Sequence, residues 1–351
     1  MEEYIAFDSH KRYTWVEHQQ ASSGKTRQYR LEHAPGAIRQ ALEGCSPGTP
    51  VAIEATANWY WITDEIEQAQ CVPRLVHPRK AKLMMGQINK TDKLDTHGLN
   101  TLQRNGTLPT VWIPPGPLRE LRELTRTRVV LVAQRTRWKN RITATLAKWG
   151  LPASAYSDPY GKKAREELAT RLEGLPEQTR WATRQMLQQL DSLSEQIREF
   201  EKRLEELVEI TPEMQWLETL PGVGVILSAT IALEIGEIGR FLSAERLASY
   251  SGTVPRVHAS GDRVRYGRTR PDVNRYLKWA FAEAGNSTAV NYRRFPERHV
   301  SQLYARLRAR KGHNKAVGAV ARHLAEAAFY VLSRQQAYRD PTAATGRTSE
   351  V

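Results

Sequence analysis

The order of strand-like and helix-like segments in residues 1–115 is the feature that most restricts the fold. Strand-like segments, which are short runs rich in apolar and β-branched residues, lie at 4–8, 12–18, 27–32, 50–54 and 71–76. Helix-like segments accompany the later strands, at 36–44, 59–70 and about 91–103. A three-strand meander followed by alternating helices and strands is typical of a mixed sheet with helices on its faces. These residues therefore predict an α/β domain, which the stretch Pro114-Pro115-Gly116-Pro117 closes.

Acidic residues stand at the ends of two of these strands. Asp8 follows the run Tyr4-Ile5-Ala6-Phe7, and Glu54 follows Val51-Ala52-Ile53. The carboxyl ends of neighbouring parallel strands meet at one edge of a sheet, where ligands bind in open α/β folds. We therefore expect these two carboxylates to converge if their strands are neighbours.

A second pair of acids begins the helix-like segment at 91–103. Asp92 and Asp95 lie three residues apart, so they share one face of a helix. If this helix starts at the same sheet edge, the four carboxylates supply hard oxygen ligands for one or two Mg²⁺ ions. Two such ions hold the attacking and leaving oxygens of a phosphodiester. A structural interpretation stays open, because acids are also favoured in first helical turns by the helix dipole and in turns after strands.

The positive charge of the chain favours nucleic acid as a partner. The 351 residues, enough for two or three domains, include 52 lysines and arginines against 38 aspartates and glutamates, a formal net charge of +14. Neutralising phosphates releases counterions, so such a balance is typical of proteins that bind nucleic acid. Solubility alone is the alternative, but the basic residues are clustered, for example along the last helices from Arg293 to Arg322.

Residues 116–210 are predicted to form a helical linker. The stretch Leu118–Trp149 is one long basic helix, and a second long helix carries apolar residues at alternating spacings of four and three, the seam of a coiled coil. The seam residues are Met186, Leu190, Leu193, Ile197, Phe200, Leu204 and Leu207. This seam packs either on the first helix of the same chain or on another subunit, and the sequence leaves both possibilities open.

Residues 211–340 form a third unit that is predicted to be mostly helical. Near its start, Leu220-Pro221-Gly222-Val223-Gly224 resembles the turn of a helix-hairpin-helix motif. Gly222 and Gly224 would let backbone N–H groups approach a phosphate closely, although a plain interhelical turn uses the same residue types. Residues 341–351 are small and polar, and we expect them to be a disordered tail.

Ser260 stands in a glycine-bounded loop beside a group of arginines. Val264 and Tyr266 alternate with basic residues there, which predicts a strand. Arginines hold phosphate oxygens with paired hydrogen bonds, and the Ser260 hydroxyl is a candidate nucleophile for phosphoryl transfer. The alternative is that Ser-Gly is an ordinary turn dipeptide. The candidate nucleic-acid-binding side chains of this region are Arg256, Arg263, Arg265, Arg268, Arg270 and Arg275.

Other features of the sequence argue against several classes of protein. Cys45 and Cys71 are the only cysteines and lack metal-type spacing, so neither a disulfide framework nor a zinc knuckle is predicted. The acidic start Met1-Glu2-Glu3 lacks the features of a signal peptide, and the longest apolar stretch, about Val225 to Ile235, is too short to span a bilayer. We therefore expect a cytoplasmic, nucleoid-associated protein with no membrane partner.

Seven short motifs together resemble those of a known family. They cover nearly the whole chain in the family's order and are Phe7-Asp8-Ser9, Ile53-Glu54-Ala55-Thr56, Lys90-Thr91-Asp92-Lys93-Leu94-Asp95, Leu220-Pro221-Gly222-Val223-Gly224, Tyr250-Ser251-Gly252, Ser260-Gly261 and Val273-Asn274-Arg275-Tyr276-Leu277. The pattern is similar to that of the DEDD transposases of insertion-sequence group 110, also called bridge-RNA-guided recombinases.

This resemblance implies a RuvC-like domain of the RNase H fold, a helical linker and a C-terminal serine transposase domain. It implies that Ser260 attacks DNA and forms a transient 5′-phosphoserine link, and that Mg²⁺ is bound by Asp8, Glu54, Asp92 and Asp95. It also implies a homo-oligomer, a dimer or tetramer with a composite site, and a structured guide RNA that pairs with target and donor DNA. Two other functions fit the residues: a RuvC-like endonuclease or junction resolvase that uses metal-activated water, and a non-enzymatic nucleic-acid-binding protein.

Overall fold

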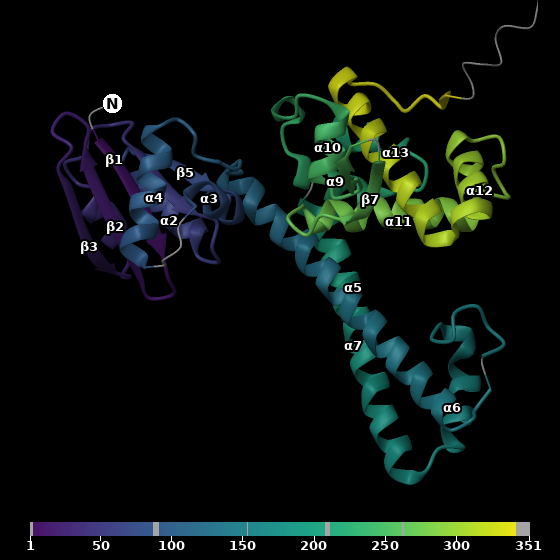
Figure 1. Cartoon of the computed structure of the whole chain (residues 1–351). Helices are drawn as coiled ribbons and strands as arrows, with labels where there is room; N and C mark the ends of the chain where they lie inside the picture. The colour runs from purple at the N-terminus through teal and green to yellow at the C-terminus, as the bar shows by residue number, and fades with distance from the viewer. Residues whose placement is uncertain (1–2, 87–90, 153, 208–210, 262, 342–351) are drawn as a thin grey trace, which may run out of the picture. The chain divides into compact units, whose positions relative to one another are not determined.

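The structure is a computed structural model, and it describes residues 3–86, 91–152, 154–207, 211–261 and 263–341. The chain divides into two compact units, Met1–Pro114 and Pro115–Val351 (Figure 1). The finer division into domains at residues 115, 210 and 340 stays a prediction. Apart from Pro341, the predicted disordered tail lies outside the described residues.

A five-stranded mixed sheet forms the framework of the first unit, in the order β3-β2-β1-β4-β5. Its strands are β1 (Glu3–Ser9), β2 (Tyr13–Gln20), β3 (Thr26–Glu32), β4 (Pro50–Glu54) and β5 (Val72–Val76). β2 pairs antiparallel with both β1 and β3, whereas β4 pairs parallel with both β1 and β5. The predicted α/β fold with a mixed sheet is confirmed, and its topology is consistent with a RuvC-like domain.

Helices cover both faces of this sheet. They are α1 (Ala37–Ala41), α2 (Trp59–Gln68), α3 (Pro78–Met85) and α4 (Asp92–Arg104). Ile5 and Phe7 of β1 belong to the core beneath α1 and α2, whereas Ala6 belongs to the core beneath α3 and α4. This alternation follows from the period of two along a strand, and the small alanine side chain lets α4 pack close to the sheet.

The helix α3 is absent from the sequence prediction. Its apolar residues do not mark a buried face, since Leu83 is 76% exposed and Met84 is 49% exposed. Pro78 at its first position and Gly86, with a positive φ at its end, are the features of its sequence that define a helix.

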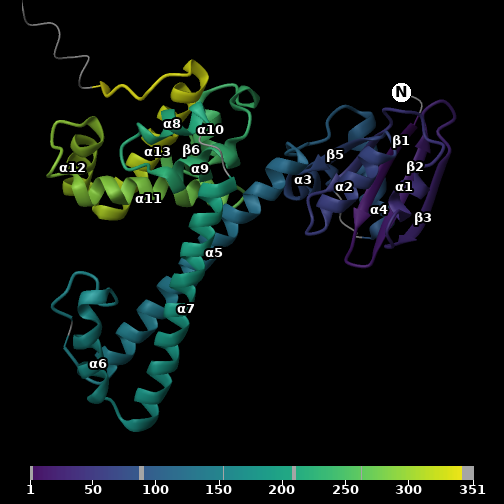
Figure 2. The same ribbon diagram turned by 180° about the vertical axis from the view of Figure 1, so that it is seen from behind.

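In the second unit, α5 (Gly116–Lys148) and α7 (Glu177–Leu207) lie side by side as an antiparallel hairpin (Figure 2). Ile142 of α5 shares a buried cluster with Leu190 of α7 at one end, and Leu121 packs near Leu204 at the other. The seam that the sequence predicts is therefore used within the chain. Between the two helices lie η1 (Lys162–Ala164) and α6 (Arg165–Glu173).

The rest of the second unit is helical apart from one hairpin, as predicted. Its elements are α8 (Pro212–Glu218), α9 (Val225–Ile235), η2 (Ile238–Arg240), α10 (Ala244–Tyr250), β6 (Pro255–Ser260), β7 (Arg263–Thr269), α11 (Arg275–Asn291), α12 (His299–Lys311) and α13 (His313–Arg334). Phe281 of α11 and Leu324 of α13 are fully buried in the large core that these helices share. Of the helices in the described part of the chain, none combines the length and apolar character that a membrane span requires.

The fully buried carboxylate of Glu234, on α9, joins three segments of the second unit. Arg126 of α5 donates to both of its oxygens, at 2.6 Å and 2.9 Å. Asn274 donates its Nδ2 to Glu234 Oε2 at 2.7 Å, while its Oδ1 caps α11 by accepting from the backbone of Tyr276 and Leu277. Asn274 is thus the cap of this helix, whereas the carboxylate of the nearby Asp272 binds Arg270.

Arg122 completes this buried network, so one of the basic residues of α5 lies in the interior. Only 3% of Arg122 is exposed, and its guanidinium donates to the backbone oxygens of Leu233 at 2.7 Å and of Glu234 at 2.9 Å. These carbonyls belong to the last turn of α9, where the helix offers them no partner of its own. Burial lowers the pKa of Arg122, and the Glu234 carboxylate opposes that effect.

We predict that Glu234→Ala lowers the free energy of unfolding by about 3–5 kcal/mol, because it leaves the buried charge of Arg122 and the charge of Arg126 without their partner. Glu205→Ala, at an exposed position of α7, is the control and should change this free energy by less than about 0.5 kcal/mol. Urea unfolding monitored by circular dichroism measures both variants. Equal stability of the two would contradict the assigned role of Glu234.

Candidate active site

Asp8 and Glu54 lie at the same edge of the sheet because β1 and β4 are parallel neighbours. Phe7 is paired with Ile53, so the next residue in each strand is one of the two acids. The period of two places both side chains on the face that α4 covers. Asp8 is buried, with a side chain that is 12% exposed, and Glu54 is half-buried.

Asp92, the first residue of α4, joins Asp8 through His10. The Nε2 atom of His10, in the turn after β1, lies 3.3 Å from Oδ2 of Asp8 and 3.2 Å from Oδ2 of Asp92. One ligand atom from each of the three residues lies within 4.8 Å of the other two. The imidazole nitrogen approaches both carboxylates without the alignment of a hydrogen bond. These atoms therefore surround a common point, as the ligands of a metal ion do.

In the described part of the chain, Glu54 and Asp95 fall outside this group of three. Glu54 ends the neighbouring strand, and Asp95 lies further along the first turn of α4, which Thr91 caps through the backbone N–H of Leu94. The structure thus brings two of the four predicted ligands together with His10, which the sequence did not single out. His10 directly follows β1 and lies two residues after Asp8, so the spacing Asp8-Ser9-His10 is the sequence signal that could have marked it.

Two polar side chains fix the geometry around His10. Asn58 donates its Nδ2 to the backbone oxygen of His10 at 2.8 Å and to the hydroxyl of Ser9 at 3.1 Å. Tyr13 donates its hydroxyl to Asp92 Oδ2 at 3.2 Å. Desolvation and the Asp92 carboxylate raise the pKa of Tyr13, so the phenol keeps the proton that it donates.

A further acid, Glu17 on β2, anchors α4 against the sheet. It is fully buried, and it accepts from Asn100 of α4 at 3.1 Å and from Gln28 of β3 at 2.6 Å. Nδ1 of His97 lies 3.3 Å from the same carboxylate. Glu17 therefore holds the helix that carries Asp92, and the sequence prediction missed it because a lone acid within a strand resembles a surface residue.

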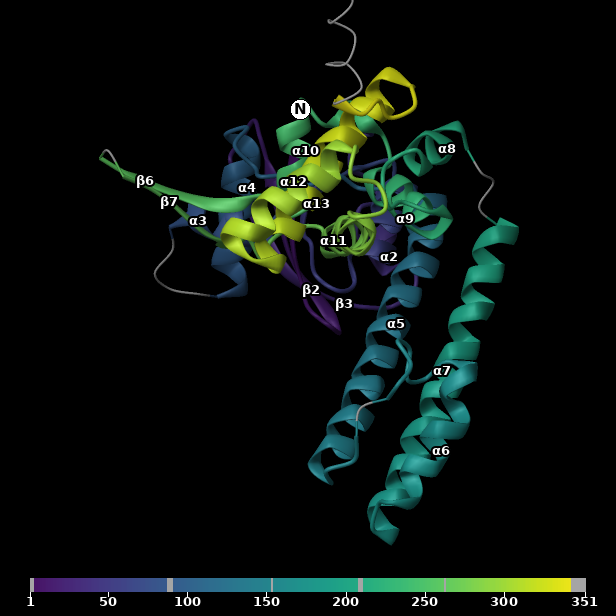
Figure 3. The same ribbon diagram turned by 90° about the vertical axis from the view of Figure 1, so that its right-hand side faces the viewer.

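Ser260 is the last residue of β6, at the end of an antiparallel hairpin that extends away from the helices of its unit (Figure 3). It pairs with Arg263 of β7, and Gly261 makes the turn with a φ of +57°, so Ser260 ends a strand rather than lying in the predicted loop. Both faces of the hairpin are exposed, since every residue of β7 from Arg263 to Arg268 is exposed, including Val264 at 56% and Tyr266 at 72%. A two-stranded hairpin of this kind is marginally stable in water, so we expect the arm to bind a partner.

The base of this arm is held firmly. Gly252, with a φ of +67°, packs so tightly on Val273 that a Cβ atom would lie 2.5 Å from its Cγ2. Lys278 of α11 donates to the hydroxyl of Thr269 at 2.7 Å, where β7 ends. The motif Tyr250-Ser251-Gly252 is thus explained by close packing at the root of the hairpin.

The predicted nucleic-acid-binding arginines differ in their surroundings. Arg263, Arg265 and Arg268 are exposed on β7, and Arg256 is half-buried on β6. Arg270 instead binds Asp272 through two hydrogen bonds, at 3.1 Å and 2.5 Å, and this carboxylate raises the pKa of Arg270. Arg275 is exposed at the start of α11, and its Cζ lies 5.1 Å from the ring centroid of Tyr276. The Cζ atom of Arg126 lies 4.9 Å from the same centroid.

Gly222 and Gly224 lie between α8 and α9. Gly222 has a φ of +79°, and a Cβ atom there would lie 2.5 Å from the backbone oxygen of Ala284 on α11. Packing therefore explains Gly222, whereas Gly224 caps α9 with open space around it. Their role in binding nucleic acid stays a prediction.

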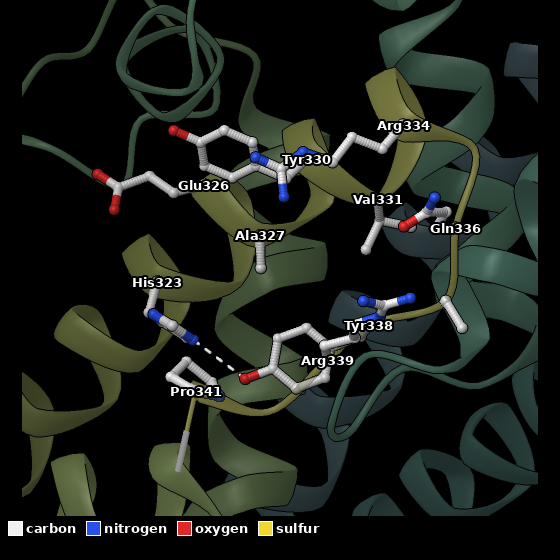
Figure 4. A pocket seen from close by; sticks show the side chains of 11 residues that line it. His323, Glu326, Ala327, Tyr330, Val331, Arg334, Gln336, Tyr338, Arg339 and Pro341 are labelled. Carbon is white, nitrogen blue, oxygen red and sulfur yellow. Dashed lines mark hydrogen bonds between the residues drawn. The ribbon is translucent and has the colours of Figure 1, made fainter. Parts of the chain in front are cut away.

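A cavity of about 350 Å³ lies elsewhere in the second unit, between α13 and the chain that follows it (Figure 4). His323 on α13 and Tyr338 line it, and the ring nitrogen of the first lies 3.2 Å from the hydroxyl of the second. Burial and the nearby His299 lower the pKa of His323. None of the predicted site residues lines this cavity, so it has no link to the proposed chemistry.

Comparisons with known proteins connect both units to transposition. Residues 5–149 match the DEDD model of the IS110 group, described as a transposase, and residues 214–300 match the model described as the transposase IS116/IS110/IS902 family. The transposase for insertion sequence element IS1111A of Coxiella burnetii is 24% identical over 267 residues, which are 76% of this chain and 72% of that protein. A probable family 20 transposase of Pseudomonas aeruginosa is 24% identical over 297 residues, covering 84% and 86% of the two chains.

Two parts of the chain, residues 5–149 and 214–300, thus match transposases of the IS110/IS116 family. Its members cut and rejoin DNA, so this transposase is a DNA-processing enzyme whose substrate is DNA. The match from residue 5 to residue 149 covers Asp8, Glu54, Asp92 and Asp95. A DEDD domain indicates dependence on a divalent metal, and the group of Asp8, His10 and Asp92 suits such an ion.

We predict that Asp92→Asn weakens the binding of Mn²⁺ to the transposase by at least about tenfold, because it removes a charged ligand. Glu67→Gln, on an exposed surface of α2, carries the same change of charge and should bind Mn²⁺ like the unmodified protein. Titration followed by electron paramagnetic resonance of free Mn²⁺ measures both affinities. Equal affinities would exclude Asp92 as a ligand.

Proposed function

We propose that this transposase joins and exchanges DNA strands by means of Ser260, with Mg²⁺ held at the edge of the sheet in its first unit. The observation that carries the proposal is the presence, in one chain, of a metal-suited group and of an exposed serine at the end of an arginine-bearing arm. Asp8, Glu54, Asp92 and Asp95 are the proposed metal ligands, and we add His10 because its Nε2 lies close to Asp8 and Asp92.

The donor atoms fit a divalent cation. Two carboxylates and one imidazole converge within 4.8 Å, and Tyr13 and Asn58 fix the segments that carry them. Carboxylate oxygens suit Mg²⁺, which keeps further positions for water and phosphate oxygens. When bound, Mg²⁺ would stabilise negative charge on the phosphate that is cut. The imidazole is an additional donor that also suits Mn²⁺.

Ser260 supplies the nucleophile in this proposal. Its Oγ forms a bond to the phosphorus while the bond from phosphorus to the 3′ oxygen breaks, which leaves a 5′-phosphoserine link and a free 3′ hydroxyl. The serine loses its proton and the 3′ oxygen gains one. A 3′ hydroxyl of another strand then attacks the same phosphorus and releases Ser260, so that strands are exchanged without loss of a phosphodiester bond.

The arm that carries Ser260 is suited to DNA. Its exposed arginines can bind phosphate oxygens with paired hydrogen bonds, while Tyr266 offers an aromatic ring beside them. A homo-oligomer, either a dimer or a tetramer, and a structured guide RNA belong to the proposal as well. The resemblance of the seven motifs supports both the homo-oligomer and the guide RNA, and the net charge of +14 suits a protein that binds DNA and RNA together.

An alternative function rests on the first unit alone. Asp8, His10 and Asp92 come from one fold, so they could bind a metal that activates water for hydrolysis, as in a RuvC-like endonuclease. In that case Ser260 is only the residue before a turn. The two functions differ in whether the protein becomes attached to DNA.

We predict that Ser260→Ala abolishes the covalent attachment of the transposase to DNA, because no other group replaces the attacking hydroxyl. The substrate is DNA that carries the ends of the element, supplied with RNA transcribed from its flanking non-coding segment. Ser333→Ala, an exposed serine of α13, is the control and should keep the adduct. The adduct is measured as a shifted band in a denaturing gel.

An adduct that persists in Ser260→Ala would overturn the assignment of the nucleophile. Cleavage by the unmodified protein with no adduct at any time would favour the metal-activated water.

We predict that replacing Arg263, Arg265 and Arg268 together by alanine lowers the salt dependence of DNA binding by about two to three in the slope of log affinity against log salt. The control replaces Arg198, Lys202 and Arg203 of α7, which are exposed but already paired with acids. Both variants lose three positive charges. Fluorescence anisotropy at several salt concentrations measures the slopes, and equal slopes would exclude the arm as a phosphate-binding surface.

A further inference from the structure

A second cluster of metal-type ligands lies at the opposite end of the sheet from Asp8. Glu3 begins β1, and His18 lies near the end of its antiparallel partner β2. Cys45 follows α1, and Cys71 directly precedes β5. These four residues therefore gather where the parallel strands begin. Since Glu3 precedes Asp8 by five positions on β1, the two clusters are about 17 Å apart.

The geometry of this cluster resembles that of a ligand set. One ligand atom each of Glu3, His18 and Cys45 lies within 4.8 Å of the other two, and Nε2 of His18 is 3.3 Å from Oε2 of Glu3. Ligand atoms of a tetrahedral zinc ion lie about 3.3–3.8 Å apart, as its bond lengths to nitrogen, oxygen and sulfur require. The thiol of Cys71 lies within hydrogen-bonding reach of the Cys45 thiol, which supplies a fourth donor.

Within the described residues, two polar atoms of this cluster lack a hydrogen-bond partner. Oε2 of Glu3 and Nε2 of His18 are buried, and neither has a hydrogen-bond partner, because their close approach lacks the required alignment. Such atoms are costly to bury. Burial, Cys71 and Glu3 raise the pKa of Cys45 to about 12, so the thiol is protonated in the absence of a cation.

We propose that Glu3, His18, Cys45 and Cys71 bind a structural Zn²⁺ ion. Two thiolates, one imidazole and one carboxylate match the preferences of zinc, whereas Mg²⁺ prefers oxygen ligands alone. Binding displaces the thiol protons and neutralises the buried charges. The ion joins β1, β2, the connection after α1 and the start of β5. It thereby locks the sheet at the end opposite the candidate active site.

This proposed zinc site has no linear sequence motif, because its ligands come from separate segments of the chain. Cys45 and Cys71 come from separate connections of an α/β fold, so their spacing differs from that of a zinc knuckle. Both are free thiols in the structure, one half-buried and one buried.

Titration of the reduced full-length protein with Co²⁺, a spectroscopic substitute for zinc, tests the proposal. We expect one equivalent to produce thiolate-to-cobalt charge-transfer absorption, which Zn²⁺ then removes. This absorption reports the cysteines alone, so Asp8→Asn should leave it unchanged while losing affinity for Mn²⁺. Cys45→Ser and Cys71→Ser should weaken it, and Zn²⁺ should raise the Tm of the unmodified protein but not of these variants.

Two further variants keep both thiols and guard against misfolding as an explanation. His18→Gln should lower the affinity for Co²⁺ by at least about tenfold, whereas His97→Gln, which lies against Glu17, should not. The proposal is overturned if the reduced protein shows no thiolate absorption with Co²⁺. It is equally overturned if the absorption is as strong in Cys45→Ser as in the unmodified protein, or if a disulfide between Cys45 and Cys71 resists reduction and Zn²⁺ leaves the Tm unchanged.

Discussion

The parallel pairing of β1 with β4 is the constraint on which the first unit depends. The pairing of Phe7 with Ile53 sets Asp8 and Glu54 side by side at one edge and places alternate residues of β1 in opposite cores. A slip of one residue would exchange the two faces and remove Asp8 from His10 and Asp92. The same strand carries Glu3 at its other end, so one element positions both candidate metal sites.

The second unit combines a firmly held base with an exposed arm. Glu234 binds Arg126 and Asn274 in the interior, and Asn274 caps the helix that follows the arm. Gly252 and Val273 close the root of the hairpin by tight packing. Ser260, at the end of the arm, lacks comparable burial. The proposed nucleophile must be reachable by a large substrate, and this arrangement gives access without loosening the core.

The sequence predicts the strands and the α/β fold well because alternating and continuous apolar runs reflect burial directly. It also identifies the acids that end strands. It does not identify His10 or Asn58, which lie in the connections that follow β1 and β4, or the approach of Cys45 to Glu3, which joins distant segments.

The burial of a charged side chain is the other feature that the sequence does not reveal. In the sequence, Arg122 is one of many basic residues of a long helix. In the structure it lies in the interior, because the backbone oxygens of Leu233 and Glu234 that accept its hydrogen bonds come close only in the folded chain. The helix α3 escapes prediction for the opposite reason, since apolar side chains such as Leu83 stay exposed and leave no periodic pattern.

The most direct test of the central claim is to identify the atom that becomes bonded to the DNA. Trypsin cuts after Arg256 and Arg263, which leaves the peptide Val257-His258-Ala259-Ser260-Gly261-Asp262-Arg263 with Ser260 as its only hydroxyl. A trapped reaction is digested with nuclease and trypsin, and its peptides are analysed by mass spectrometry. The account predicts a nucleotide remnant on Ser260 in this peptide. Attachment to another residue, or incorporation of ¹⁸O from labelled water at the cut 5′ phosphate without attachment, would contradict it.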